Sequence, residues 1–448
     1  MAALIKNICR DLWTTIANVD TICCSVLFQA NPLAIKISSR LAQVKPSPTM
    51  AVTALAAELR AQGRDVVGLG AGEPDFDTPD HIKSAAIEAI NSGKTKYTAV
   101  DGIAELKNAI VGKFKNDNGI NFQPAEILVS CGGKQSFYNL AQAVLDDGDE
   151  VLIPAPYWVS YPDIALLAGG KPVCVETTQE QSFKMTPEQL DDALTDKTRI
   201  VVLNSPSNPS GKLYSKAEMK ALGEVLKNYP DAIIATDDMY EHIVWTEEGF
   251  SNILNACPEL QERTVVMNGV SKAYAMTGWR IGYAGGPEPI IAAMRKIQSQ
   301  STSNPTSISQ WASVAALTGG NDCIVPMLAA FKERHDFVVK SLNQMKGASC
   351  IESDGTFYAF PNVQQAIDAN PDVKNDVEFS SWVLDKAGVA IVPGSAFGTE
   401  GHVRLSFATS MENLQKAMQR MGDLLDSAKP CRLTICTATA TLPRSLPR

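Results

Sequence analysis

The chain contains 448 residues, which is enough for two or three domains and a substantial hydrophobic core. Hydrophobic residues make up 45% of it and charged residues 20%, proportions that exclude a collagen-like, a fully disordered or a disulfide-scaffold chain. The 40 Lys and Arg residues are outnumbered by 49 Asp and Glu residues, and the net charge of −9 provides no basic field to bind nucleic acid.

Residues 1–36 show no sustained hydrophobic period, so we expect a poorly ordered N-terminal extension. The apolar stretch at residues 21–30 is similar to a signal-peptide core, but Asp11 and Asp20 precede it and no clear cleavage site follows. No run of 18 apolar residues occurs, which predicts no membrane span. Ten scattered cysteines without a Cys-x-x-Cys pair are typical of reduced thiols. Together these features predict a cytoplasmic protein.

The first clear element is a helix predicted to begin after Thr78. Thr78 and the following Pro79 have the order of an N-cap and a proline in the first turn. The Asn-Ser-Gly sequence at residues 91–93 then provides a C-terminal stop.

Six short apolar segments follow, and each is short enough to be a buried strand. They cover residues 127–130, 151–154, 200–204, 232–236, 265–268 and 281–284. Their alternation with helical segments is typical of a mainly parallel α/β sheet with crossover helices. Ligands bind such sheets at the carboxyl ends of the strands, so the residues after each segment are the candidates for chemistry.

Two glycines follow the first of these strands. Gly132 and Gly133, with Lys134 after them, separate the strand from a helix. Glycines in this position let backbone N–H groups approach a phosphate at the positive end of the helix. Taken alone, the two glycines are more typical of a tight turn, and Asn208 after a later strand is also a common turn residue.

An acid and a lysine follow two of the later strands. Asp237 ends a buried segment, where a carboxylate needs a cation, and Lys272 has apolar neighbours. A lysine, a carboxylate, phosphate donors, and phenol and amide groups are together what a pyridoxal phosphate site requires. No metal site is predicted, because the four histidines share no ligand spacing and suit structural roles. They are His81, His242, His335 and His402.

The end of the chain carries a last helix and a tail. Leu414, Met418, Met421 and Leu425 form a hydrophobic stripe that is typical of ordinary core. Residues 427–448 contain no acid and are rich in Thr, Pro and Arg, so we expect a disordered tail.

Five motifs, in order along the chain, resemble those of class I aminotransferases, specifically the prokaryotic-type aspartate aminotransferases. They are residues 71–76 (AGEPDF), 156–162 (PYWVSYP), 207–211 (SNPSG), 271–280 (SKAYAMTGWR) and 403–406 (VRLS). The resemblance covers about residues 38–426. It implies a pyridoxal phosphate enzyme of fold type I that moves the amino group of L-aspartate to 2-oxoglutarate by a ping-pong mechanism.

The resemblance also implies the domain organisation. A large cofactor domain with a seven-stranded, mainly parallel sheet would span residues 71–310. A smaller α/β domain would combine residues 37–70 with residues 311–426. The family further implies a homodimer whose active sites are shared between subunits.

The family's residues around the cofactor ring match five positions. Lys272 matches the lysine that bonds covalently to the cofactor and then moves a proton at the substrate. Asp237 matches the acid that keeps the ring nitrogen protonated, and the spacing to Tyr240 favours it over the neighbouring acid. Tyr240 and Asn208 match the pair that hydrogen-bonds the phenolic oxygen of the ring. Trp158 matches the aromatic residue that stacks on the ring.

The cofactor phosphate is implied to bind a second group of residues. Gly132 and Gly133 would donate backbone N–H groups, and Ser271 and Arg280 would add a hydroxyl and a guanidinium. Tyr97 resembles the tyrosine that reaches this phosphate from the other subunit.

The substrate is implied to bind through both of its carboxylates. Arg404 matches the arginine that grips the α-carboxylate through two hydrogen bonds, and Gly72 matches a backbone donor to the same group. Lys134 and Thr49 match the pair associated with the distal carboxylate, and some relatives with this pair also accept prephenate. Trp158 and Asn208 also border the substrate in the family.

Two alternative functions stay open. An aromatic aminotransferase or a carbon–sulfur lyase would share the cofactor and the fold, and would be distinguished by its substrates. A non-catalytic regulator that fuses this fold to a DNA-binding domain is disfavoured, because about 36 weakly basic residues are too few for that domain.

Overall fold

The computed structural model of the protein describes residues 35–46 and 48–427. The chain divides into two compact units between Gln43 and Val44. The described part of the first unit contains an exposed 3₁₀-helix, η1 (Ser39–Gln43). The second unit carries the sheets, the remaining helices and the cavities. Residues 1–34 of the predicted extension and 428–448 of the predicted tail lie outside the described residues.

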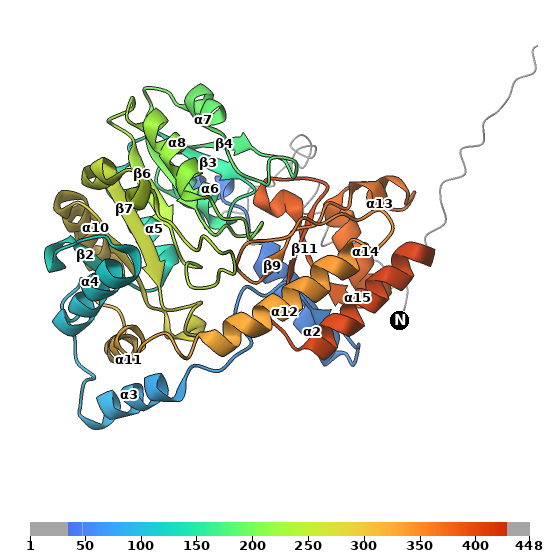
Figure 1. Cartoon of the computed structure of the whole chain (residues 1–448), viewed down its shortest axis with the longest axis horizontal. Helices are drawn as coiled ribbons and strands as arrows, with labels where there is room; N and C mark the ends of the chain where they lie inside the picture. The colour runs from blue at the N-terminus through green and yellow to red at the C-terminus, as the bar shows by residue number, and fades with distance from the viewer. Residues whose placement is uncertain (1–34, 47, 428–448) are drawn as a thin grey trace, which may run out of the picture. The chain divides into compact units, whose positions relative to one another are not determined.

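A seven-stranded sheet, with the strand order β2-β8-β7-β6-β5-β3-β4, forms the largest layer of the second unit (Figure 1). Neighbouring strands are parallel except at β8, which is antiparallel to both β2 and β7. The strands are β2 (Ile127–Ser130), β3 (Glu150–Ala155), β4 (Lys171–Glu176), β5 (Thr198–Asn204), β6 (Ile233–Asp237), β7 (Thr264–Gly269) and β8 (Gly282–Gly285). The predicted mainly parallel sheet is confirmed.

The six predicted strand segments agree with the strands to within two residues at each end, and β4 is the strand that was missed. β4 lies at an edge of the sheet, where it pairs with β3 alone. Of its six residues only Val175 is buried, so the segment lacks the continuous apolar run that identifies the inner strands.

Helices cover both faces of the sheet because consecutive strand residues point to opposite sides. Val151 and Ile153 of β3 join one core cluster with α5, α6 and α10, whereas Leu152 joins the other with α4, α7 and α8. The helices of this region are α3 (Asp80–Asn91), α4 (Ala104–Asn118), α5 (Gly133–Val144), α6 (Ser160–Leu167), α7 (Pro187–Ala193), α8 (Lys216–Leu226), α9 (Ile253–Ala256), α10 (Glu288–Ser301) and α11 (Ser307–Thr318). Its 3₁₀-helices are η2 (Pro124–Glu126), η3 (Pro258–Arg263) and η4 (Thr277–Trp279).

The start of α3 differs from the prediction. The N-cap position is Pro79, and no side chain caps the helix. The Thr78 hydroxyl instead donates to the Ala275 carbonyl at 2.7 Å and accepts from the Trp279 ring N–H at 3.0 Å. The capping prediction was wrong because a tertiary contact takes the hydroxyl. The predicted end is right, since Gly93 follows α3 with a left-handed φ of 74°.

Two small sheets and five α-helices lie beyond the large sheet in the described residues. One small sheet pairs β1 (Val67–Gly68) in parallel with β10 (Val389–Ala390), and the other has the order β11-β12-β9. Figure 1 shows α13, α14 and α15 grouped at this end of the unit. The remaining elements are α2 (Pro48–Ala61), α12 (Val325–Leu342), β9 (Tyr358–Ala359), α13 (Gln364–Asp368), α14 (Asp376–Ala387), β11 (Val392–Pro393), η5 (Gly394–Phe397), β12 (Val403–Ser406) and α15 (Met411–Ser427).

The predicted hydrophobic stripe of the last helix is confirmed. Its four side chains, Leu414, Met418, Met421 and Leu425, are buried in α15, which packs against α12 and α14. The pairing of β1 with β10 joins an early segment of the unit to its last third. The predicted domain boundaries at residues 70 and 310 stay predictions, and residue 310 falls inside α11.

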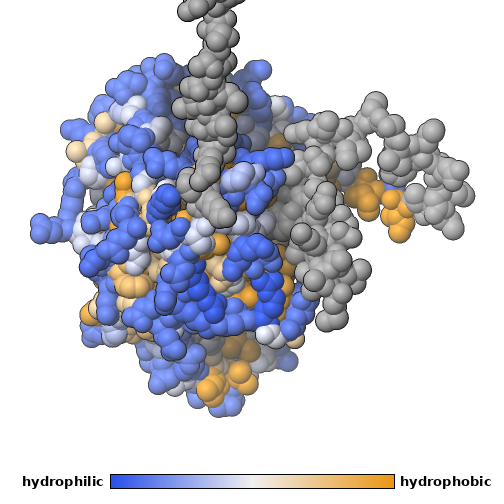
Figure 2. All heavy atoms as spheres, turned by 90° about the vertical axis from the view of Figure 1, so that its right-hand side faces the viewer, coloured by the Kyte–Doolittle hydropathy of each residue, from blue (hydrophilic) through white to orange (hydrophobic). Residues whose placement is uncertain are grey.

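The face of the molecule on the side of α13–α15 is largely hydrophilic, with small separate hydrophobic patches (Figure 2). Exposed large hydrophobic side chains elsewhere in the described chain include Ile87 and Ile90 of α3, and Tyr97. No helix within the described ranges combines the length and the hydrophobicity that a bilayer span requires.

Candidate active site

A cavity of about 470 Å³ opens at the carboxyl ends of the central strands. Asp237 is the last residue of β6, and Ser271 and Lys272 follow β7. Tyr358 from β9 and Arg404 from β12 complete the wall. The residues singled out by the sequence that line this cavity are Thr49, Gly72, Gly133, Lys134, Trp158, Asn208, Asp237, Tyr240, Ser271, Lys272, Arg280 and Arg404.

Lys272 is the amine of this cavity. Its Nζ donates a hydrogen bond to the Gly72 carbonyl and lies 6.0 Å from the centre of the Tyr240 ring. Burial, with the nearby Arg404 guanidinium as the next cause, lowers the pKa of Lys272 to about 8. A sizeable fraction of this amine is therefore neutral near physiological pH, as a nucleophile or a base requires.

Asp237 places a carboxylate in the cavity wall. It accepts a hydrogen bond of 2.6 Å from the Tyr161 hydroxyl and one of 3.3 Å from the Met239 backbone N–H. Burial raises its pKa despite these donors, which marks a carboxylate without an adequate cation. The neighbouring Asp238 is bonded by the Asn252 amide at 2.6 Å and does not line the cavity. The two acids thus have different environments.

Asn204, the last residue of β5, and Asn208, in the turn after it, also line the cavity. The Asn204 amide donates to the Asp237 carbonyl at 2.9 Å, and its Oδ1 accepts from the Asn208 backbone N–H at 2.9 Å. Asn204 therefore holds the turn that presents Asn208 to the cavity. Asn204 ends the predicted strand segment 200–204 but was not among the predicted site residues.

The N-terminus of α5 provides an anion-binding end of the cavity. Gly132 precedes the helix with a left-handed φ of 89°, and a Cβ on it would collide with the Arg280 guanidinium. Arg280 donates to the Thr277 carbonyl at 2.9 Å and to the Cys131 carbonyl at 3.3 Å. The guanidinium thus lies against the N-terminal turn of α5, an arrangement suited to phosphate.

Arg404 is buried, with 2% of its surface exposed, and one of its donors is unpaired. Its Nη1 donates to Asn208 Oδ1 at 2.9 Å and its Nη2 to the Gly70 carbonyl at 2.8 Å, whereas Nε is buried without a partner. The guanidinium also lies 4.4 Å from the centre of the Tyr358 ring. An unpaired buried donor is costly, so this guanidinium fits an anionic ligand such as a carboxylate.

Lys134 and Thr49 lie at the outer part of the cavity. The Lys134 ammonium is 5.2 Å from the centre of the Trp158 ring. Lys134 is exposed over its surface as a whole, yet desolvation of its ammonium by the surrounding protein lowers its pKa, with the Arg280 charge as the second cause and Asp163 opposing both. The Thr49 hydroxyl is buried without a partner. These two side chains offer a cation and a free hydroxyl to a ligand.

Two of the predicted site residues do not line the cavity. Gly132 lies just behind it, against Arg280. Tyr97 is 92% exposed and takes no part in the cavity wall. Tyr358, Glu73 and Thr277 line the cavity without having been singled out. Glu73 lies inside the first motif and Thr277 inside the fourth, but no motif marks Tyr358.

One predicted structural histidine lies in a charged cluster. His242 Nε2 is 3.4 Å from an Asp117 oxygen and 3.3 Å from a Glu241 oxygen. These three residues are close enough together to offer ligands to a metal ion. The Lys113 ammonium forms an ion pair with the same Glu241 oxygen and already supplies positive charge there.

The sequence of the chain is similar to those of known aminotransferases. The family model for aminotransferase class I and II matches residues 64–421. An aspartate/prephenate aminotransferase of Nitrosomonas europaea is 62% identical over 395 residues, 87% of this chain and 100% of that protein. An aspartate aminotransferase of Geobacillus stearothermophilus is 47% identical over 392 residues, which are 88% of this chain and 99% of that protein.

The fold is similar to that of solved aspartate aminotransferases. The aspartate aminotransferase of Rhizobium meliloti has a TM-score of 0.85 at 46% identity, covering 88% of this chain and 99% of that one. The aspartate aminotransferase of Thermus thermophilus, solved with maleate, has a TM-score of 0.82 at 44% identity, covering 87% and 100%.

Proposed function

The chain belongs to the aminotransferases of class I and II, and on that premise we propose that it transfers the amino group of L-aspartate to 2-oxoglutarate. Oxaloacetate and L-glutamate are the products of this ping-pong reaction, and pyridoxal 5′-phosphate is the proposed cofactor. The observation that carries the proposal is a lysine of lowered pKa beside a buried arginine with an unpaired donor in one cavity.

The residues of the cavity fit this cofactor. When bound, pyridoxal phosphate supplies an aldehyde for covalent attachment and a protonated ring that withdraws electrons from the substrate Cα. Lys272 is the proposed point of attachment, and Asp237, whose raised pKa reflects a missing cation, would pair with the ring nitrogen. Tyr240 and Asn208 would bond the ring oxygen, and Trp158 would cover the ring face.

The phosphate would occupy the end of the cavity at α5. Backbone N–H groups of Gly132 and Gly133 and the Ser271 hydroxyl are the proposed donors there. The Arg280 guanidinium, held by two backbone carbonyls, would supply a positive charge and parallel donors. Since these groups come from segments far apart in the chain, binding of the phosphate would also stabilise the site.

The Lys272 amine has a second proposed task. Once substrate releases Lys272 from the cofactor, its neutral amine can take the proton from the substrate Cα. The resulting ammonium can then deliver this proton to the C4′ carbon of the cofactor. Its pKa of about 8 suits both the acceptance and the return of this proton. After burial, the nearby charge of Arg404 is the next cause of this lowered pKa.

The substrate would bind through two carboxylates. The unpaired Nε of Arg404, together with a neighbouring Nη and the Gly72 backbone, would bind the α-carboxylate. Lys134 and the unpaired Thr49 hydroxyl would bind the distal carboxylate. We also propose prephenate as a substrate, because its second carboxylate suits the same pair and several of the similar proteins are named aspartate/prephenate aminotransferases.

We further propose a cytoplasmic homodimer with shared active sites. The 92% exposed Tyr97 ring fits this arrangement, in which Tyr97 of the partner subunit would reach the phosphate. Free thiols in the described part of the chain suit a reducing compartment. They are Cys131, Cys174, Cys257, Cys323 and Cys350.

A substrate panel tests the proposal. The purified enzyme with pyridoxal phosphate is mixed separately with aspartate, phenylalanine, prephenate and cystathionine, and the half-reactions are followed by the absorption of the cofactor. Aspartate and prephenate should react well. Lys134→Ala should raise the KM for aspartate by about tenfold to a hundredfold and change the reaction of phenylalanine little, since only the distal carboxylate loses a partner.

The matched control is Lys171→Ala, which removes an exposed lysine of β4 outside the cavity. This variant should keep the wild-type KM for both amino acids. Failure of the wild-type enzyme with every dicarboxylic substrate would overturn the assignment and favour an aromatic aminotransferase or a lyase.

A further inference from the structure

Tyr358 is a buried member of the cavity wall to which neither the motifs nor the comparisons give a role. It is 1% exposed and belongs to the two-residue strand β9. β9 runs antiparallel to β12, where Tyr358 pairs with Ser406, two residues from Arg404. Diagonal neighbours on one face of such a pair lie within reach of an aromatic ring. The sheet register thus places the Tyr358 ring beside Arg404.

Tyr358 contacts three separate parts of the site. Its hydroxyl is 3.0 Å from the Tyr240 hydroxyl, so one phenol donates to the other. Its ring lies 4.4 Å beneath the Arg404 guanidinium. The same hydroxyl lies where a Cβ on Gly72 would come within 2.7 Å of it, so the loop at Gly72 packs directly on this phenol. One side chain therefore links groups proposed to bind the cofactor and the substrate.

We infer that Tyr358 is a positioning residue that acts on Tyr240 through its hydroxyl and on Arg404 through its ring. The inference rests on the proposed function, because it assigns Tyr240 to the cofactor oxygen and Arg404 to the α-carboxylate. The two actions use different parts of one side chain. They can therefore be separated by substitution.

The hydroxyl acts through the direction of its hydrogen bond. Tyr240 uses its only proton when it donates to the cofactor oxygen, so its own oxygen is left to accept, and Tyr358 is in place to donate. A donor at its oxygen makes Tyr240 a stronger donor in turn, because hydrogen bonds in a chain polarise one another. Tyr358 thereby helps to stabilise negative charge on the cofactor oxygen.

The ring acts through the position of the guanidinium. Arg404 is held in one plane by Asn208, the Gly70 carbonyl and the face of the Tyr358 ring. A cation over an aromatic face is attracted to it, more strongly when both are buried. The ring thus helps to fix the plane of the guanidinium in the cavity wall, where a carboxylate can accept from it.

Two variants separate these actions in the cofactor-loaded enzyme. Tyr358→Phe keeps the ring and removes the hydroxyl, so the pKa of the nitrogen joining Lys272 to the cofactor should rise by about half a unit. A pH titration of the visible absorption measures it. The KM for aspartate should stay within about twofold of wild type.

Tyr358→Leu removes the ring as well. It should show the same rise in this pKa and, in addition, weaken the binding of aspartate and of the unreactive dicarboxylate maleate by about threefold to thirtyfold. Spectral titration with maleate measures this second effect without turnover.

The control is Tyr214→Phe, which removes another buried hydroxyl, one that accepts from the Met185 backbone N–H outside the cavity. It should change neither the titration nor the binding of maleate. Thermal unfolding of all three variants, followed by circular dichroism, separates loss of stability from loss of positioning.

Each outcome decides a part of the inference. If the titration of Tyr358→Phe coincides with that of wild type, the action on Tyr240 is excluded. If Tyr358→Leu binds maleate as wild type does, the action on Arg404 is excluded. The titration requires only bound cofactor, so a wild-type enzyme that is titratable but inactive with aspartate would overturn the proposed substrate and leave the Tyr358 test intact. A chain that binds no pyridoxal phosphate would overturn both.

Discussion

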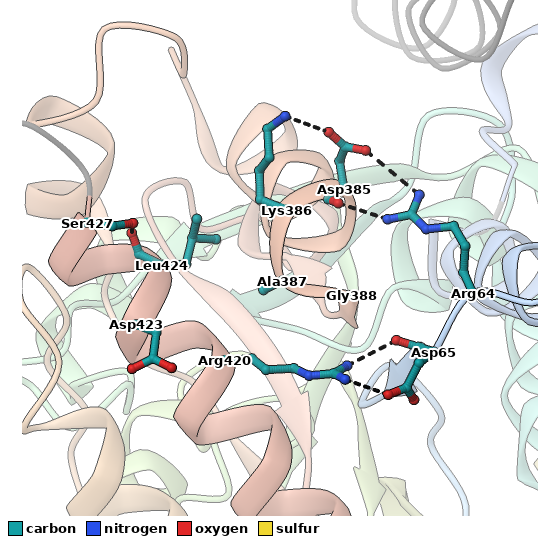
Figure 3. Close-up of a pocket in the computed structure, with 10 residues that line it drawn as sticks. All are labelled: Arg64, Asp65, Asp385, Lys386, Ala387, Gly388, Arg420, Asp423, Leu424 and Ser427. Atoms are coloured by element: carbon teal, nitrogen blue, oxygen red, sulfur yellow. Dashed lines mark hydrogen bonds and ion pairs between the residues drawn. The ribbon is translucent and has the colours of Figure 1, made fainter. Parts of the chain in front are cut away.

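The active-site cavity and a second pocket near the C-terminal helix have similar size and similar residue types. The volumes are about 470 and 550 Å³, and each pocket is lined by Arg, Lys and Asp side chains. The second pocket lies between α14, α15 and the segment before β1 (Figure 3). Its lining residues are Arg64, Asp65, Asp385, Lys386, Ala387, Gly388, Arg420, Asp423, Leu424 and Ser427.

The two pockets differ in how their polar groups are paired. In the second pocket, Arg420 bonds Asp65 at 2.5 Å and Arg64 pairs with Asp385, and both carboxylates have more than half of their side-chain surface exposed (Figure 3). In the active site, the Arg404 Nε and the Thr49 hydroxyl are buried without partners. A buried unpaired group is costly unless a ligand completes it, so the pairing of the polar groups, and not the volume, makes the first cavity the better candidate for a ligand site.

The largest effect is expected from Lys272→Ala, which removes the proposed attachment point. Activity should fall by more than about a thousandfold, because both the covalent bond and the proton transfer are lost. The measurement is aspartate turnover together with borohydride reduction, which should fix the cofactor on wild type only. Lys416→Ala, which removes an exposed lysine paired with Asp65, is the control and should retain both. Cofactor fixed on the Lys272 variant would contradict the proposal.

The adjacent acids Asp237 and Asp238 should differ strongly. Asp237→Asn removes the negative charge at the ring nitrogen and should lower kcat by about a hundredfold to a thousandfold, since a broken buried ion pair is costly. Asp238→Asn leaves the cavity wall unchanged and should lower kcat less than about tenfold. Steady-state kinetics at saturating cofactor compares them. Equal losses in the two variants would show that the environments of the two acids do not separate their roles.

The pH dependence of stability is expected to show a smaller effect. The folded chain releases the Lys272 proton near pH 8, whereas the unfolded chain keeps it until about pH 10.5. Lys272 therefore destabilises the cofactor-free fold fully below pH 8, and this destabilisation fades as the pH rises to 10.5. Lys272→Met should thus raise the urea midpoint of the cofactor-free protein more at pH 7 than at pH 9.5. An equal gain at both values would contradict the lowered pKa.

The smallest effect is expected in the second pocket. Arg420→Ala removes an exposed ion pair with Asp65, and such pairs contribute little because water and salt screen them. The melting temperature should stay within about two degrees of wild type and the kinetics should not change. Differential scanning calorimetry and the aspartate assay check this. A large loss of activity would mean that this pocket has a function of its own.

Local sequence patterns were sufficient for much of the fold and part of the site. The apolar runs of the inner strands and the stripe of α15 were predicted because burial imposes a simple period on the sequence. The edge strand β4 was missed because one side of it meets solvent. Thr78 was wrongly predicted as a cap, since its hydroxyl is taken by Ala275 and Trp279, about two hundred residues away.

The sequence by itself determined the order of strands and helices, the motifs of the family and the residue types available for chemistry, because these depend on neighbours within a few residues. The motif spacing already favoured Asp237 over Asp238, but only the tertiary structure decided that Arg404 keeps an unpaired donor and that Tyr358 connects it to Tyr240. Those facts depend on contacts between segments that are far apart in the chain. Such contacts leave no local pattern in the chain.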